Sequence, residues 1–132
     1  MNKLKARISD IKNVENLNLV NFDFNQQTLS MVGLDLDDEI KIDTKVELSA
    51  KSTHIAIAKE FTGELSYSNQ IKATIVEIDY GQLLTSVKAD VEGILLESII
   101  TSSSANRMDL KSKDEVILLI KATELFISKV IK

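Results

Sequence analysis

The densest group of hydrogen-bond donors in the sequence is the run of hydroxyl residues Thr101–Ser104. It follows the apolar pair Ile99–Ile100 and stands where we expect a short helix over Ser102–Met108. The first N–H groups of a helix lack intrahelical partners, so together with hydroxyl donors they suit an anion. The alternative is an ordinary serine-rich helix cap, because serine is common there.

Two further polar segments could serve the same chemistry. Lys121 ends the apolar segment Val116–Ile120, where its ammonium could reach a partly buried anion as a compact charge, or could simply be solvated. The pair Lys51–Ser52 repeats this pattern earlier in the chain. The segment Leu65–Gln70 carries hydroxyls and amides that could donate to a ligand, or it is a polar linker.

These segments belong to a tandem repeat. An offset of 67 residues aligns the first part of each half, and an offset of 70 residues aligns the remainder. The first offset pairs Asn2/Asn69, Val20/Val87 and Leu29/Leu96, and the second pairs Lys51/Lys121 and Ile57/Ile127. The extra residues of the second half fall within Leu96–Leu110. We interpret the chain as two repeats, 1–61 and 68–132, joined at Thr62–Glu64.

Each repeat is predicted to be β-structure. Apolar and polar residues alternate with period two in Leu4–Ile8, Val20–Phe24, Val46–Ala50, Ile71–Ile75 and Val87–Val91. About five short strands in about 60 residues favour a small OB-type barrel. The predicted fold is therefore all-β, with two tandem OB-like five-stranded small barrels, each with at most one short helix. A ~60-residue unit buries only about 60% of its surface, so we expect copies to pack on copies.

Composition excludes several functions. The 132 residues contain no cysteine and one histidine, His54, so disulfides, thiolate metal sites and cysteine nucleophiles are ruled out, and a zinc site or serine triad would depend on one residue. We expect no catalytic residues, no metal site and no enzyme activity. The net charge of −4 argues against a nucleic-acid partner. Without an apolar run near ~20 residues we expect no membrane partner and a cytoplasmic location.

Taken together and in order, the polar segments resemble the Mop family of molybdate-binding domains, called TOBE domains where they are appended to transporter ATPases and molybdate-responsive regulators. The residues that carry the resemblance are Ser66, Ser68–Gln70, Ile100–Thr101, Ser104–Ala105, Leu110, Asp114–Val116 and Ile120–Glu124. They cover the second repeat, and the duplication extends the resemblance to the first. The chain is thus similar to a tandem protein of two Mop domains.

The resemblance implies a site between neighbouring copies, with molybdate or tungstate as the ligand and molybdenum present only as oxyanion. It assigns to one protomer Ser66, Ser68, Asn69, Lys121 and Ala122, and to another Thr101, Ser104 and Ala105. It also implies a homo-oligomer, a dimer at least, with a trimer of tandem chains suggested by the family.

Two departures from the family pattern affect this site. The family's Ser-Ala-Arg-Asn reads Ser66–Asn69 here, so Ser68 replaces an arginine and a charge that would add affinity is lost. The first repeat keeps Lys51 and Ser52 as a second candidate site, but Asp35–Asp38 stands where Thr-x-x-Ser-Ala belongs. Because carboxylates repel an anion, we interpret the first repeat as mainly architectural.

Two other interpretations are weaker. The acidic turn Asp35–Asp38 lacks the residue spacing of a calcium-binding loop, and Phe22 and Phe24 fit a buried core better than a surface that stacks on bases.

The function that these residues predict is non-catalytic oxyanion binding, for intracellular storage, homeostasis or sensing. A dianion that only accepts hydrogen bonds suits a pocket lined only by donors, and nothing here separates molybdate from tungstate. The alternative is a regulatory or effector module of a molybdate-responsive regulator or transporter ATPase that acts through a separate partner chain. An OB-type single-strand binder is a third hypothesis, which the acidic charge disfavours.

Overall fold

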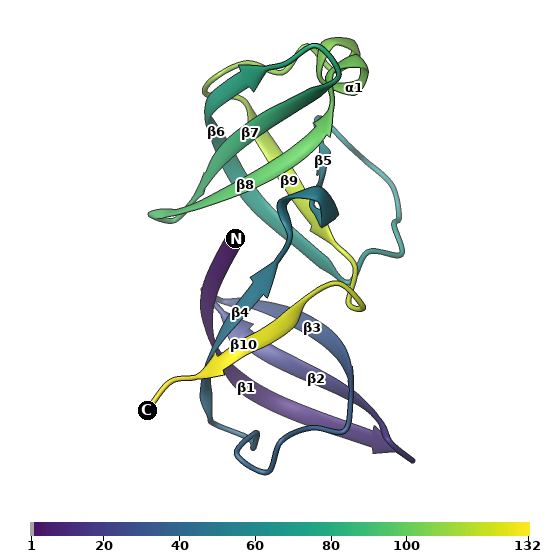
Figure 1. Cartoon of the computed structure of the whole chain (residues 1–132), viewed down its shortest axis with the longest axis vertical. Helices are drawn as coiled ribbons and strands as arrows, with labels where there is room; N and C mark the ends of the chain where they lie inside the picture. The colour runs from purple at the N-terminus through teal and green to yellow at the C-terminus, as the bar shows by residue number, and fades with distance from the viewer. Residues whose placement is uncertain (1) are drawn as a thin grey trace.

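In the computed structural model, which describes residues 2–132, the chain forms two curled five-stranded sheets placed end to end (Figure 1). The first sheet has the order β10-β4-β1-β2-β3. Its strands are β1 (Asn2–Val14), β2 (Leu17–Phe24), β3 (Gln27–Leu34), β4 (Lys45–Ala50) and β10 (Phe126–Val130). The second has the order β5-β9-β6-β7-β8. Its strands are β5 (Ala56–Ala58), β6 (Asn69–Tyr80), β7 (Leu84–Val91), β8 (Ile94–Thr101) and β9 (Glu115–Ile120). The predicted fold of two small, all-β, OB-like units is confirmed.

The two sheets exchange their outermost strands. β10 comes late in the chain but pairs with β4 of the first sheet, with Phe126 opposite Ser49. β5 comes from the first half but pairs with β9 of the second sheet, with Ala56 opposite Leu119. Each of the two repeats that we propose, 1–61 and 68–132, therefore contributes four strands to one sheet and one strand to the other. Neither sheet is complete without both halves of the sequence.

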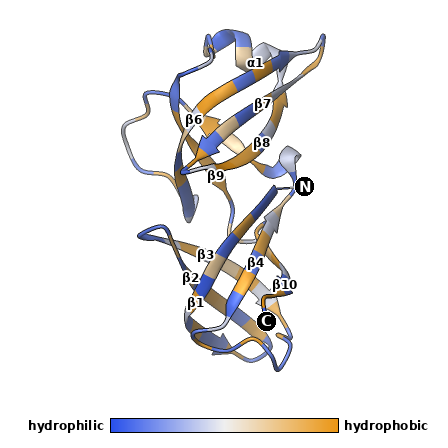
Figure 2. Cartoon of the chain, turned by 90° about the vertical axis from the view of Figure 1, so that its left-hand side faces the viewer, coloured by the Kyte–Doolittle hydropathy of each residue, from blue (hydrophilic) through white to orange (hydrophobic). Residues whose placement is uncertain are grey.

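The alternation in the sequence places one face of each sheet in a buried core. Figure 2 shows apolar and polar residues alternating along the strands. Phe22 and Phe24 are 0% and 2% exposed, so their predicted place in the core is confirmed. Asn25 and Gln26 form the β2–β3 turn with positive φ angles of 45° and 64°, and Glu92 and Gly93 form the β7–β8 turn with 49° and 92°. Tight turns with left-handed residues match the twist of an antiparallel hairpin.

A short helix, α1 (Ser102–Arg107), accounts for the extra residues of the second repeat. Its core-facing residue Ala105 is fully buried, and Leu110 just beyond it is 2% exposed. The first unit has only a loop in the matching place between β3 and β4, and its one helical turn is η1 (Ser52–His54). The predicted helix over Ser102–Met108 is confirmed, with Met108 as its C-cap.

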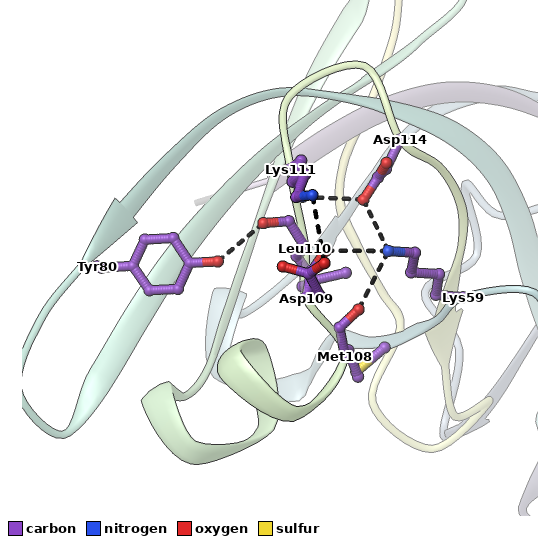
Figure 3. A network of polar contacts seen from close by, with 7 residues as sticks. All are labelled: Lys59, Tyr80, Met108, Asp109, Leu110, Lys111 and Asp114. Carbon is purple, nitrogen blue, oxygen red and sulfur yellow. Dashed lines mark hydrogen bonds and ion pairs between the residues drawn. The ribbon is translucent and has the colours of Figure 1, made fainter.

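The exchanged segment is fastened to this helix by a polar network (Figure 3). Lys59, which follows β5, donates from Nζ to the carbonyl oxygens of Met108 at 3.1 Å and Asp109 at 3.0 Å, and pairs with Asp114 at 3.2 Å. These contacts satisfy carbonyl groups that a helix end leaves without partners. Tyr80 donates to the next carbonyl, that of Leu110, at 2.8 Å. Lys59 thus joins the first half of the sequence to the end of α1.

Within residues 2–132 no helix combines the length and the apolar character that crossing a membrane would need.

Candidate functional site

Five of the predicted site residues lie at one end of the second sheet. Asn69, the first residue of β6, pairs with Ile120, the last residue of β9. This pairing puts the segment before β6 beside the residues that follow β9. The residues brought to this end are Ser66, Ser68, Asn69, Lys121 and Ala122. Ser66, Ser68 and Lys121 are exposed, and Ala122 is half-buried.

The other three predicted residues lie at the opposite end of the same sheet. Thr101 ends β8 and pairs with Leu84, while Tyr80, the last residue of β6, pairs with Thr85. Thr101 is therefore near the far end of β6 from Asn69, a strand length on the order of 30 Å at about 3.3 Å per residue. Ser104 and Ala105 follow Thr101 in α1, which Figure 1 shows at the tip of the second unit. One chain alone does not bring the two groups together.

Thr101 is the N-cap of α1, and the hydroxyl of Ser104 beside it can donate a hydrogen bond outward. Thr101 Oγ1 accepts the Ser104 N–H at 3.2 Å, and its hydroxyl donates to Ser104 Oγ at 3.0 Å. Arg107 also donates to Ser104 Oγ, from Nη2 at 3.3 Å. Because the Ser104 oxygen accepts twice, its own hydrogen is left to donate outward. The sequence interpretation missed Arg107, although a residue three positions along a helix lies on the same face.

The remaining hydroxyls of the run have different surroundings. Ser102 is 5% exposed, donates to the Gly81 carbonyl at 2.7 Å and shares a hydrogen bond of 2.8 Å with the Thr85 hydroxyl. Its N–H donates to the Leu83 carbonyl. Ser103 is exposed. Ser102 therefore anchors the helix start to the neighbouring hairpin, while Thr101 is exposed and Ser104 is half-buried.

Asn69 joins the two units. Its side chain is fully buried, its Nδ2 donates to the Ser30 carbonyl at 2.9 Å, and its Oδ1 accepts the Ser30 N–H at 2.7 Å. Its repeat equivalent, Asn2, makes the same two hydrogen bonds with Glu97. Asn2 Nδ2 donates to the Glu97 carbonyl at 2.9 Å, and its Oδ1 accepts the Glu97 N–H at 2.6 Å. Both side chains act as clamps between the units. The sequence had indicated Asn69 only as an anion ligand, a role that stays a prediction.

We call these two contacts the first junction, at Asn2 and Glu97, and the second junction, at Asn69 and Ser30. The second candidate site, Lys51 and Ser52, lies at the first junction. There Lys51 is exposed, while Ser52 donates to Glu97 Oε1 at 2.8 Å. At the second junction the residue in the place of Glu97 is neutral: Ser30 Oγ donates to Asn21 Oδ1 at 2.8 Å.

The charge of the first junction is fixed by hydrogen bonding. Ser86 donates to Glu97 Oε2 at 2.7 Å, and together with the bond from Ser52 it holds the pKa of the Glu97 carboxyl below its usual value. Hydrogen bonds to the charged form of a carboxyl favour that form. Glu97 is thus a carboxylate at neutral pH. The repeat offset pairs it with Ser30, but nothing in the sequence signals that the two positions face the junctions.

Histidine and carboxylate chemistry gives no metal centre in the part of the chain that the structure describes. No group of three or more His, Cys, Asp or Glu side chains in residues 2–132 could hold a metal ion. His54 pairs with Glu124 through Nδ1 and Oε2 at 2.9 Å. Glu124 is the repeat equivalent of His54, so this pair joins the same position of the two repeats.

Comparisons with known proteins agree with this architecture. Residues 65–127 match the family model of the TOBE domain. Among solved structures, the cytoplasmic molybdate-binding protein ModG, crystallised with molybdate bound, superposes with a TM-score of 0.89 at 19% identity, over 96% of this chain and 94% of that chain. At that identity the likeness concerns the fold. A molybdate-binding protein from Sporomusa ovata is 34% identical over 53% of this chain and 100% of that chain, with a TM-score of 0.47. No curated protein sequence matches the chain.

Proposed function

We propose that this chain, which belongs to the TOBE domain family through residues 65–127, binds a tetrahedral oxyanion, molybdate or tungstate, and catalyses no reaction. The observation that carries the proposal is the pairing of Asn69 with Ile120, because it brings the segment that carries Ser66 and Ser68 beside the segment that carries Lys121. Within residues 2–132 Lys121 makes no ion pair with a carboxylate of the same chain. Its charge is therefore available to a ligand.

The chemistry of this end suits an ion that only accepts hydrogen bonds. Molybdate at neutral pH is a dianion with four acceptor oxygens, so hydroxyls and an ammonium satisfy it fully. A protonated phosphate would set its own O–H against another donor, and a buried polar group without a partner costs about 1–3 kcal/mol. Hydrogen bonds to a charged group are about twice as strong as neutral ones, so one lysine with several dipoles suffices.

A second chain completes the site in this proposal. The donors Thr101 and Ser104 lie at the far tip of the same sheet, so they can serve only a neighbour's Lys121. Large apolar side chains are exposed beside this tip: Leu83 is 82% exposed and Leu84 is 57% exposed. Exposed apolar groups at a predicted contact favour burial against another protein surface. We infer a homo-oligomer, a dimer or a trimer, that holds the anion between protomers in the cytoplasm for storage, homeostasis or sensing.

Isothermal titration calorimetry tests the binding proposal. The chain is titrated with molybdate, tungstate, sulfate and phosphate. We expect binding of molybdate and tungstate and little heat with phosphate. Lys121→Ala should weaken molybdate binding about ten- to a hundredfold, the worth of a charged hydrogen bond. Lys129→Ala, which removes an exposed lysine elsewhere, is the control. Equal heats for all four anions, or none with molybdate, would contradict the proposal.

A second pair of variants tests the neighbour's contribution. Ser104→Ala removes the hydroxyl whose hydrogen is free to donate, and should weaken molybdate binding several-fold without unfolding the chain. Ser103→Ala, one position earlier and exposed, should leave binding unchanged. Unchanged affinity in Ser104→Ala would show that the turn does not contact the anion.

A further inference from the structure

The two junctions have the same main-chain contact but different side chains. At each, a buried asparagine exchanges two hydrogen bonds with the main chain of one residue on the other unit: Asn2 with Glu97, and Asn69 with Ser30. The repeat offset that aligns Asn2 with Asn69 also aligns Ser30 with Glu97. The side chains of Glu97 and Ser30 therefore start from equivalent places, one as a carboxylate and the other as a neutral hydroxyl.

The Glu97 carboxylate occupies donors that would otherwise suit an anion. Its two oxygens take the hydroxyl hydrogens of Ser52 at 2.8 Å and Ser86 at 2.7 Å. Lys88 adds an attractive positive charge, although its ammonium also pairs with Glu77 at 3.5 Å. Two hydroxyls and a nearby ammonium around two oxygens make a donor set of the kind that an oxyanion needs. In this chain the anion that these donors bind is the Glu97 carboxylate itself.

The place is also hollowed. A shallow hollow of about 190 Å³, open to solvent, adjoins the carboxylate and is lined by Asn2, Ser52, Lys88, Leu95, Leu96 and Glu97. This volume exceeds the roughly 30 Å³ share of one water molecule, so removal of the carboxylate would leave room for a larger solute. Lys51, next to Ser52, is exposed at the same junction.

We propose that Glu97 is an internal anion that closes the first junction to oxyanions, so that the chain takes its ligand at the second junction alone. This inference rests on the proposed function and adds the residue that selects between two repeat-related places. A dianion brought near the carboxylate meets like-charge repulsion, and it finds the Ser52 and Ser86 hydroxyls already engaged. Glu97, a residue of the second repeat, thus blocks anion binding at Ser52 of the first repeat.

A purely structural role for Glu97 makes a different prediction. Asn2 holds the main chain of Glu97, and replacement of the side chain leaves that clamp in place. If Glu97 merely ties Ser52 to Ser86, its removal loosens the junction and creates no affinity. If it stands in for an external anion, its removal creates a binding site, which a loss of structure cannot imitate.

The test is the number of molybdate ions bound per chain in Glu97→Ser, which copies the second junction, measured by calorimetry and equilibrium dialysis with sodium molybdate. We expect one additional ion per chain, bound at least about tenfold more tightly than any ion at that junction in the wild type, because a nearby like charge is gone. Glu97→Ser with Ser52→Ala should lose the gain. Glu97→Ala, which also frees both hydroxyls and leaves the same space, should gain the ion as well, and it is the deciding variant if Glu97→Ser does not fold.

The same measurement in the Lys121→Ala background separates this inference from the proposed function. A wild type that binds molybdate, with no gain in either Glu97 variant, overturns the inference and leaves the proposed function standing. A wild type that binds none refutes the proposed function. In that case a gain in Glu97→Ser with Lys121→Ala still supports the role of Glu97, and the lack of a gain overturns it.

Discussion

The first and second junctions share the same main-chain contact but differ in the charge of one side chain, which is Glu97 at the first and Ser30 at the second. Both rest on a buried asparagine that clamps the other unit, yet Glu97 brings a carboxylate to Ser52 at the first junction, while Ser30 brings a neutral hydroxyl to the second. The outer tips differ in the same sense, because α1 presents Thr101 and Ser104 where the first unit has the acidic loop Asp35–Asp38. The two units share one scaffold, and we propose that a few substitutions decide which of them can hold an anion.

Ser30→Glu is expected to have the largest effect, since it gives the second junction the side chain of the first. A carboxylate there would repel a dianion and offer its oxygens to the donors that the ligand needs. We expect molybdate affinity to fall by more than about a hundredfold. Ser30→Gln, of similar size without charge, is the control and should bind much more tightly than Ser30→Glu. If calorimetry gives the two variants equal affinity for molybdate, the charge at position 30 does not control binding.

Asn69→Ala should cause the largest loss of stability. It deletes both hydrogen bonds to the Ser30 main chain and leaves that part-buried N–H and carbonyl without protein partners, at a cost of about 2–4 kcal/mol. The free energy of unfolding in urea measures it. Asn106→Ala, at an exposed position of α1, should change stability by less than about 0.5 kcal/mol. A loss in Asn69→Ala no greater than in Asn106→Ala would mean that the clamp does not hold the units together.

Lys59 and Lys129 give a matched comparison of the two exchanged strands. Lys59→Met removes the ammonium that binds two carbonyls and Asp114 while keeping the apolar stem, and should cost about 1–2 kcal/mol. Its repeat equivalent Lys129 is exposed, so Lys129→Met should be close to neutral. Urea unfolding distinguishes them. Similar losses in both variants would show that the network at the end of α1 adds nothing.

Acid should weaken the first junction through Glu97. Hydrogen bonds from Ser86 and Ser52 lower the pKa of its carboxyl from 4.5, so the stability that it contributes is present above pH 4.5 and is lost as pH falls through the lower folded-state pKa. Glu97→Gln should therefore lose less stability than the wild type between neutral pH and that acidic range. Glu64→Gln, at an exposed position, should follow the wild-type curve. Parallel curves for Glu97→Gln and the wild type would contradict the hydrogen-bonded carboxylate.

Much of the fold follows from local patterns. Period-two alternation predicted which face of β1, β2 and β7 is buried, and the serine run with Ala105 predicted α1, because both signals lie within a few neighbouring residues. The exchange of β5 and β10 could not be predicted. A strand's pairing partner depends on contacts far along the chain, and residues Ala56–Ala58 read equally well as the end of either sheet.

The candidate site was predictable in its residue types and less so in their roles. The sequence indicates that Lys121 and Ser68 are polar residues next to strands, and the register of β6 with β9 brings their segments together. It does not reveal that Asn69 is fully buried as a clamp, since an asparagine at the start of a strand is ordinarily exposed. Glu97 was missed for the same reason. On its own strand it reads as a solvated residue, and its partners Ser52 and Ser86 come from elsewhere in the fold.

The most direct test of the central claim is a crystal structure of the wild-type chain grown with molybdate, with anomalous diffraction measured at the molybdenum edge. We predict a peak beside Lys121 and Ala122, within hydrogen-bonding distance of Thr101 and Ser104 of a neighbouring protomer, and none between Ser52 and Ser86. A peak at the Glu97 carboxylate, or peaks of equal height at both junctions, would contradict the account.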